Sequence, residues 1–158
     1  MVTLVKSNQR QETQLVNVWM WENHRTALQW RRVRVGTMPN HELGRMFQVT
    51  LRWVDAIFVE DNRVFIVEAK LRPDAGAIGQ LLLYKQEFLR TPEFSSYWDL
   101  PVHMVFLCKK FDTAIAELTA KNDIIYEVFT DEDISESLLA PKENSMELSE
   151  DMQDTNRQ

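Results

Sequence analysis

The sequence contains a single cysteine, Cys108, among its 158 residues. One thiol excludes an internal disulfide framework and any zinc or iron–sulfur site that cysteines would hold. It also favours a reducing, cytoplasmic setting, because disulfides form mainly in oxidising compartments. The three histidines, His24, His41 and His103, lack the spacing of metal ligands. The composition therefore predicts no metal centre built on cysteine or histidine.

Long apolar runs are also missing. No run of about 18 apolar residues occurs, and residues 1–12 lack the apolar core of a secretory signal, so we expect no membrane partner. The sequence has no glycine-rich phosphate-binding loop and no serine or cysteine nucleophile motif, which argues against a P-loop hydrolase or an enzyme with such a nucleophile. Its hydrophobic content of 44% suits one domain with a buried core.

The net charge of −6 is unevenly distributed. Residues 131–158 contain nine acidic and two basic residues, a net charge of −7, so residues 1–130 carry +1. The acidic segment has few aromatic residues, and we therefore expect a disordered tail over 131–158 after a domain over 1–130. Its charge allows three roles: solubility, binding of a basic partner protein, or occupation of a nucleic-acid cleft.

Hydrophobic periodicity predicts alternating helices and strands, hence an α/β fold. The expected helices cover residues 11–25, 77–90 and 113–122, and the expected strands cover 27–37, 53–60, 63–70, 102–110 and 124–129, with a loop over 38–50. The near-continuous apolar run at 102–110 is typical of a central strand that is covered on both faces.

Residues 53–70, "WVDAIFVEDNRVFIVEAK", predict a hairpin in which Asp61-Asn62 forms a two-residue turn. This turn places Asp55 directly opposite Glu68. Side chains alternate along a strand, so both acids share one face of the sheet with Lys70. If the register differs by one or two residues, Glu68 and Lys70 instead form an ordinary ion pair at the end of a strand.

Two opposed carboxylates repel each other, because their Cβ atoms lie only about 4.5–5.5 Å apart. Burial beside apolar neighbours increases the cost of ionising Asp55 and Glu68. Three arrangements relieve the repulsion: one carboxyl is protonated, a basic side chain lies between the two, or a divalent cation binds both. A backbone carbonyl beside the pair would complete an oxygen site suited to Mg²⁺ or Mn²⁺.

The order of these residues resembles the PD-(D/E)XK nuclease superfamily. Asp55 precedes "EAK" at residues 68–70, and the next helix carries Gln80-x-x-x-Tyr84, which is similar to the motif of the RecB-like branch. The resemblance covers roughly residues 11–110. Val54 stands where the family name has proline, and the cysteines of the iron–sulfur subgroup are absent. The resemblance implies a restriction-endonuclease-like core, a central mixed sheet of four to five strands flanked by helices in αβββαβ order.

The resemblance also implies roles for these residues. Asp55 and Glu68 would hold the metal ion, with the carbonyl of Ala69 as a third ligand. The ion would polarise a phosphodiester oxygen and lower the pKa of a bound water. Lys70 would orient that water or stabilise charge on the phosphate.

Two further elements complete the implied site. Gln80 and Tyr84 are four residues apart and share a helix face; Gln80 would position the water or a ligand, and Tyr84 would contact a phosphate. Glu12 fits the acid that many family members add from the first helix, with Glu22 as a poorer alternative. Glu12 is equally explained as a solvated glutamate near the start of a helix.

Basic residues gather around the first strand and the start of the hairpin. Together with Tyr84, these candidates for nucleic-acid binding are Arg31, Arg32, Arg34 and Arg52. Arginines of this kind contact phosphates. They also protect a solvated edge strand from pairing with other chains, which explains them almost as well.

The sequence thus predicts a hydrolase, a Mg²⁺-dependent DNA nuclease. A catalytically inactive subunit of the same fold, which binds nucleic acid or assembles with a partner, is the second hypothesis. An interaction module with a structural ion pair is the third. Exonuclease and endonuclease action both stay open, as do DNA and RNA. Because a domain of this size offers a short footprint, we expect a homodimer or a larger nucleic-acid-processing complex.

Overall fold

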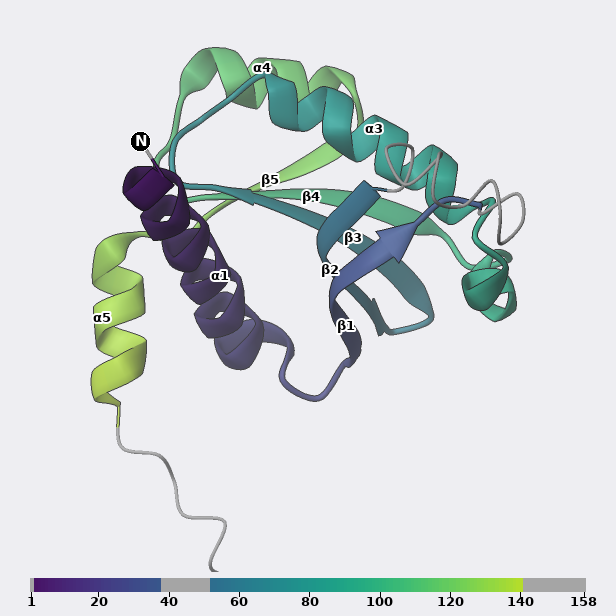
Figure 1. Ribbon diagram of the computed structural model, residues 1–158, viewed down its shortest axis with the longest axis horizontal. Coiled ribbons are helices and arrows are strands. Elements are labelled where there is room, and N and C mark those ends of the chain that lie inside the picture. The colour runs from purple at the N-terminus through teal and green to yellow at the C-terminus, as the bar shows by residue number, and fades with distance from the viewer. Residues whose placement is uncertain (1, 38–51, 141–158) are drawn as a thin grey trace, which may run out of the picture.

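The chain alternates helices and strands in the order that its hydrophobic pattern predicts. The computed structural model describes residues 2–37 and 52–140 (Figure 1). Its elements are α1 (Val2–His24), β1 (Leu28–Val35), β2 (Arg52–Glu60), β3 (Arg63–Lys70), α3 (Gly76–Phe88), the 3₁₀ helix η2 (Pro92–Tyr97), β4 (Val102–Cys108), α4 (Thr113–Lys121), β5 (Ile124–Val128) and α5 (Asp131–Leu139). The loop predicted over 38–50 lies outside the described residues.

The strands form one mixed sheet in the order β1-β2-β3-β4-β5. β1, β2 and β3 pair antiparallel, whereas β4 pairs parallel with both β3 and β5. Figure 1 shows α3 and α4 on one face of the sheet and α1 and α5 on the other. The predicted α/β class, with a mixed sheet of four to five strands flanked by helices, is confirmed. None of the helices within residues 2–37 and 52–140 combines the length and apolar character that crossing a bilayer requires.

The hairpin between β2 and β3 has the predicted register. Asp61 and Asn62 adopt positive φ values of 51° and 58°, as a type I′ turn requires, and this turn matches the twist of the flanking strands. The paired residues are Glu60–Arg63, Val59–Val64, Phe58–Phe65, Ile57–Ile66 and Ala56–Val67. Turn chemistry therefore fixes which residues of the two strands face each other.

Two apolar layers hold the helices against the sheet. On one face, α3 buries residues spaced three or four apart, including Ile78, Leu81 and Phe88, against Ile57 and Ile66. On the other face, α1 buries Leu15, Trp19 and Met20 among others, against Ala56, Phe58, Val67 and Ala69. Burial of each large apolar side chain contributes roughly 1.5–3 kcal/mol. The sheet thus covers the apolar side of α1.

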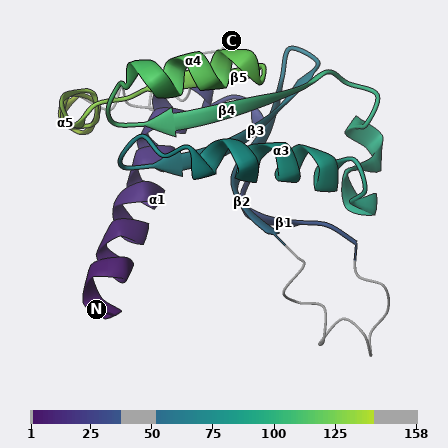
Figure 2. The same ribbon diagram turned by 90° about the horizontal axis from the view of Figure 1, so that it is seen from above.

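Helix α1 begins at Val2, well before the predicted start at residue 11. Figure 2 shows its first turns extending beyond the body of the sheet. Residues 6–10, KSNQR, contain no apolar side chain, so apolar periodicity does not connect the start of the helix with residues 11–24. The extension carries polar side chains toward β1, the edge strand on this side of the sheet.

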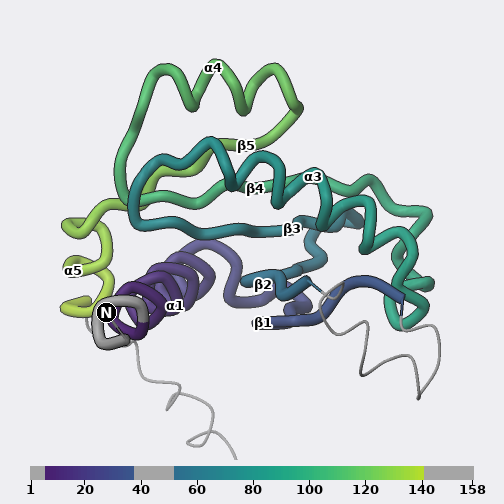
Figure 3. Tube along the Cα trace, turned by 45° about the horizontal axis from the view of Figure 1, so that its top comes forward, coloured from purple at the N-terminus to yellow at the C-terminus, as the bar shows by residue number. Residues whose placement is uncertain are grey.

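The expectation of disorder from residue 131 onward is wrong for 131–139, which form α5. Thr130 and Asp133 make a capping box at its start, and acidic residues in a first turn favour the helix dipole. Ile134 is buried against the α1 layer, and Ser137 donates a hydrogen bond to Glu22 of α1. Figure 3 shows α5 alongside α1.

The domain boundary predicted at residue 130 would therefore leave α5 outside the domain, although α5 packs on α1. Residues 141–158, the rest of the predicted tail, lie outside the described residues. The roles expected for that tail stay predictions.

Candidate functional site

A cavity of about 190 Å³ opens where α1, β2, β3 and α3 meet. Five residues predicted for catalysis or metal binding line it: Asp55, Glu68, Gln80, Tyr84 and Glu12. The rest of its lining consists of Gln9, Thr13, Arg32, Trp53 and Val54. We call this cavity the acidic pocket. The fold thus brings together residues from five elements, α1, β1, β2, β3 and α3.

Asp55 immediately precedes Ala56 in β2. The pairing of Ala56 with Val67 is the last backbone pair between β2 and β3. Its Oδ2 accepts a hydrogen bond from the backbone N–H of Ala69 at 2.8 Å. The carboxyls of Asp55 and Glu68 also lie within hydrogen-bonding reach of each other. The two carboxyls therefore lie side by side just beyond the last backbone pair of the hairpin.

The environment of Glu68 disfavours its ionised form. Its side chain is 6% exposed. Burial, followed by the charge of Asp55, raises the pKa of Glu68 to about 8. Burial also raises the pKa of Asp55, although the Ala69 N–H counteracts part of this change. Burial and mutual repulsion therefore favour a pair that titrates as one unit and retains a proton above the ordinary carboxyl range.

Lys70 is the basic neighbour of this pair. Its Nζ lies 3.4 Å from Oε1 of Glu68. Burial acts to lower the pKa of Lys70, but the negative charges of Glu68 and Glu12 outweigh it, so the net change is upward. Lys70 is therefore cationic, and its positive charge offsets part of the repulsion between the two acids.

Glu12 of α1 lines the same pocket, and burial raises its pKa. Among residues 2–37 and 52–140, however, no three histidine, cysteine, aspartate or glutamate side chains gather closely enough to share one metal ion. Glu12 therefore faces the acid pair without joining it in one cluster, and its role as a ligand stays a prediction. Glu22, the alternative position, contacts Ser137 of α5 instead.

Gln80 and Tyr84 reach the pocket from α3, as their spacing predicts. Tyr84 is buried, and its hydroxyl hydrogen-bonds to Glu68. Burial, reinforced by the charges of Glu68 and Asp55, raises the pKa of Tyr84. The phenol therefore stays neutral and can donate its proton in a hydrogen bond to the Glu68 carboxylate.

The backbone of Arg32 bends β1 beside the acid pair. Its φ of 44° lies in the left-handed region, which costs a residue other than glycine on the order of 1–3 kcal/mol. Trp30 and Val33 consequently pack on the same face, although they are three residues apart. In β2, Val54 and Ile57 do likewise across Asp55. In both strands, the alternation of side chains between the two faces of the sheet is therefore interrupted at Arg32 and Asp55. Arg32 itself lines the acidic pocket.

The other predicted basic residues differ in their placement. Arg52 is exposed and close enough to Tyr84 for its charge to oppose the rise in the pKa of that residue. Arg34 is exposed, and its guanidinium lies 4.4 Å from the ring centroid of Trp53. Arg31, in contrast, is half-buried and donates to Gln29. Its Nη1 is buried without a hydrogen-bond partner in the described part of the chain. Arg31 thus fits a substrate-contacting role less well than the others.

Sequence reasoning missed the contribution of the first turns of α1, which supply Gln9 and Thr13 to the pocket. It also missed Trp53 as a lining residue. A usable signal was present in the polar spacing of Lys6, Gln9, Arg10 and Thr13, which repeats at three or four residues. This spacing becomes visible only when polar as well as apolar periodicity is read.

No protein-family model matches the sequence, and no curated protein is detectably similar to it. Several solved structures are similar in fold, among them a repair endonuclease and a protein bound to double-stranded DNA. A repair endonuclease from Pyrococcus abyssi has a TM-score of 0.51 at 16% identity over 75% of this chain and 46% of that one. EndoMS in complex with double-stranded DNA has a TM-score of 0.51 at 15% identity over 73% of this chain and 43% of that one. The chain spans less than half the length of either protein, and it shares their α/β fold.

Proposed function

We propose that this chain is a metal-dependent nuclease that hydrolyses phosphodiester bonds of DNA in the acidic pocket. The observation that carries the proposal is the buried, opposed pair Asp55 and Glu68, in which the pKa of Glu68 is raised to about 8. Perturbed acids in a pocket are typical of functional sites. The fold shared with a repair endonuclease and with a DNA-bound protein supports the same conclusion.

The donor set of the pair fits a hard divalent cation. Two carboxylates that repel each other in a buried place would both ionise around Mg²⁺ or Mn²⁺. The N–H of Ala69 points toward Asp55, and the carbonyl of a strand residue points to the same side as its N–H. Asp55, Glu68 and the carbonyl of Ala69 would therefore hold the ion. When bound, it would polarise the phosphodiester and lower the pKa of a coordinated water.

Gln80, Tyr84 and Arg32 of the pocket lining, together with Lys70 and Arg52 close to it, support the same chemistry. Lys70 is cationic beside Glu68 and would stabilise negative charge that develops on the phosphate. Tyr84 holds the Glu68 carboxyl in position through its hydroxyl. Gln80 would orient the attacking water or a ligand. Arg32 and Arg52 would contact the phosphate backbone.

A cleavage assay tests the proposal. Linear, circular and branched DNA are each incubated with the wild type, Asp55→Ala, or the control Asp99→Ala, which removes an exposed acid from the segment after η2. Each mixture contains Mg²⁺, Mn²⁺ or EDTA. We expect the wild type and the control to cleave with either metal ion but not with EDTA, and Asp55→Ala to be inactive. Unchanged cleavage by Asp55→Ala would reject the assignment.

The circular substrate distinguishes two modes of cleavage, because only an endonuclease cuts DNA without ends. The Gln80-x-x-x-Tyr84 element favours action on ends or single strands, by its resemblance to the RecB-like motif. Under this proposal, linear DNA is degraded faster than circular DNA. Equal rates on both substrates would instead assign an endonuclease.

A catalytically inactive, DNA-binding subunit is the second candidate. It is favoured by the lack, within the described residues, of a third acidic or histidine side chain clustered with Asp55 and Glu68. In the same assay, this candidate predicts DNA binding by the wild type without cleavage under any metal condition.

A further inference from the structure

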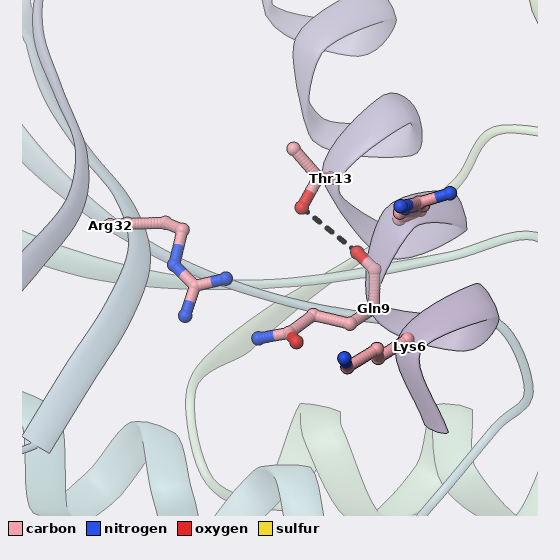
Figure 4. Close-up of a pocket in the computed structure, with 5 residues that line it drawn as sticks. Lys6, Gln9, Thr13 and Arg32 are labelled. Atoms are coloured by element: carbon pink, nitrogen blue, oxygen red, sulfur yellow. Dashed lines mark hydrogen bonds between the residues drawn. The ribbon is translucent and has the colours of Figure 1, made fainter. Parts of the chain in front are cut away.

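A second cavity, of about 290 Å³, lies between the first turns of α1 and the bend of β1 (Figure 4). It is lined by Lys6, Gln9, Arg10, Thr13 and Arg32. We call it the basic pocket, because all three charged side chains in its lining are cationic. This local positive charge contrasts with the net charge of −6 of the whole chain.

One face of α1 supplies most of this pocket. Lys6, Gln9, Arg10 and Thr13 follow one another at intervals of three or four residues, so they form a stripe along the helix. Figure 4 shows Lys6 and Gln9 pointing from α1 toward Arg32 on β1. Turning the Gln9 carboxamide so that its oxygen, rather than the nitrogen drawn in Figure 4, faces Arg32 gives hydrogen bonds from Nη1 at 2.8 Å and Nη2 at 3.1 Å. In that orientation Gln9 holds the guanidinium at the wall of the pocket.

The basic pocket adjoins the acidic pocket. Gln9, Thr13 and Arg32 line both cavities, so the two cavities are neighbours, one with acidic and one with basic side chains. Glu12 and Lys6 are six residues apart on α1, which corresponds to roughly 9 Å along the helix. Each strand of B-DNA carries one charge per roughly 3.4 Å, so one to three nucleotides span this separation.

The bend at Arg32 gives an independent indication of function. The left-handed backbone of this residue, with a φ of 44°, places its guanidinium at the wall shared by the two pockets. An extended backbone at this position would keep the regular alternation of β1 and turn the side chain to the other face of the sheet. Backbone strain held in place at a pocket is typical of functional sites.

We infer that the basic pocket binds a second phosphate group of the strand whose scissile phosphodiester occupies the acidic pocket. This inference rests on the nuclease function proposed above. Guanidinium and ammonium groups are the usual ligands of phosphate oxygens. The group bound is either an internal phosphodiester or a terminal phosphate, since both present the same oxygens. Lys6, Arg10 and Arg32 thus set the position of the strand relative to the acid pair.

Salt-dependent binding tests this inference. DNA affinity is measured in EDTA by fluorescence anisotropy for the wild type, the double variant Lys6→Ala/Arg10→Ala, and the control Arg63→Ala/Lys121→Ala. All four residues are exposed, and both double variants lower the net charge by the same amount. The probes are oligonucleotides with a 5′-phosphate, a 3′-phosphate or hydroxyl ends, and a circular single strand. Cleavage of the same probes is measured with Mg²⁺.

We expect the double variant, unlike the control, to flatten the dependence of log K on log salt concentration. The slope should change by about 0.7 per lost contact on single strands and about 0.9 on duplexes. Loss on every probe assigns an internal phosphodiester, and loss confined to one phosphorylated end assigns a terminal phosphate. Equal slopes for the double variant and the control overturn the inference. If the wild type still cleaves in that case, the nuclease function stands; if the wild type neither binds nor cleaves, both proposals fail.

Discussion

The carboxylate of Asp55 takes the place of a backbone acceptor toward Ala69: its Oδ2 receives the Ala69 N–H at 2.8 Å. The backbone pairing of β2 with β3 stops at the neighbouring pair, Ala56–Val67, and does not include Asp55. One side chain thus satisfies a buried N–H, ends the ladder, and brings a negative charge beside Glu68. The structural role of Asp55 and its proposed role in metal binding therefore have to be separated by choice of substitution.

Asp55→Asn makes this separation. The asparagine keeps an oxygen that can accept from Ala69 but removes the charge that disfavours ionised Glu68. We expect Asp55→Asn to be more stable than the wild type in EDTA at pH 8, by about 1 kcal/mol or more, since each pKa unit relieved corresponds to about 1.4 kcal/mol. Urea unfolding measures this difference, and a less stable Asp55→Asn would contradict it.

Asp55→Ala provides the comparison. It removes the charge as well, but it leaves the Ala69 N–H without its acceptor, which costs about 1–3 kcal/mol for a buried group. We therefore expect Asp55→Ala to be less stable than Asp55→Asn under the same conditions. Equal stabilities of the two variants would mean that water replaces the lost acceptor.

The raised pKa of Glu68 makes stability depend on pH. In the metal-free folded chain this carboxyl stays protonated up to about pH 8, whereas its ordinary pKa is 4.5. Between these values the unfolded state binds fewer protons, so the contribution of Glu68 to the free energy of unfolding falls as pH rises, by roughly 1–4 kcal/mol.

Glu68→Gln isolates this contribution. Urea unfolding of the wild type and the variant in EDTA, from pH 5 to pH 9, should give curves whose difference changes steadily up to about pH 8 and then levels off. A difference that does not vary with pH would show that Glu68 titrates at its ordinary value.

Tyr84→Phe should shift the same titration. The Tyr84 hydroxyl donates to Glu68 and favours its ionised form, so removal of the hydroxyl raises the pKa of Glu68 further. Stabilisation by Mn²⁺, measured as a rise in Tm, should then require a higher pH in Tyr84→Phe than in the wild type. Tyr97→Phe, whose ring packs against Trp30 away from the pocket, is the control. A shift toward lower pH would contradict the assigned hydrogen bond.

Gly79→Ala tests the start of α3. A Cβ at this position would have no neighbour within 4 Å, and alanine favours a helix over glycine by about 0.5–1 kcal/mol. We expect thermal unfolding to show a stabilised variant with wild-type cleavage. If DNA passes close to this turn of α3, cleavage would fall while stability rises.

Much of the fold was predictable because local chemistry determines it. The Asp61-Asn62 turn sets the hairpin register, and that register predicts the opposition of Asp55 and Glu68. Gln80 and Tyr84 reach the pocket because a four-residue spacing gives one helix face. These predictions need only periodicity and turn geometry, which a single sequence contains.

The features that escaped prediction depend on contacts between distant segments. Nothing in the side chain of Arg32 favours a left-handed backbone, so the bend of β1 is not visible in the sequence. The sequence does not show that Lys6, Gln9 and Arg10 lie across from Arg32 of β1, and this placement is what suggests a role for them. Helix α5 was mistaken for tail because its charge outweighed the single buried contact of Ile134 and the capping box at Thr130.

Direct measurement of metal binding tests the central claim, that the acid pair is a cation site. Titration calorimetry at pH 7, in buffers of different ionisation enthalpy, counts both the ions bound and the protons released. We predict that the wild type binds Mn²⁺ or Mg²⁺ and releases close to one proton per ion as Glu68 ionises, and that Asp55→Asn and Glu68→Gln lose this binding. Equal binding by the wild type and both variants, or no binding by the wild type, would contradict the account.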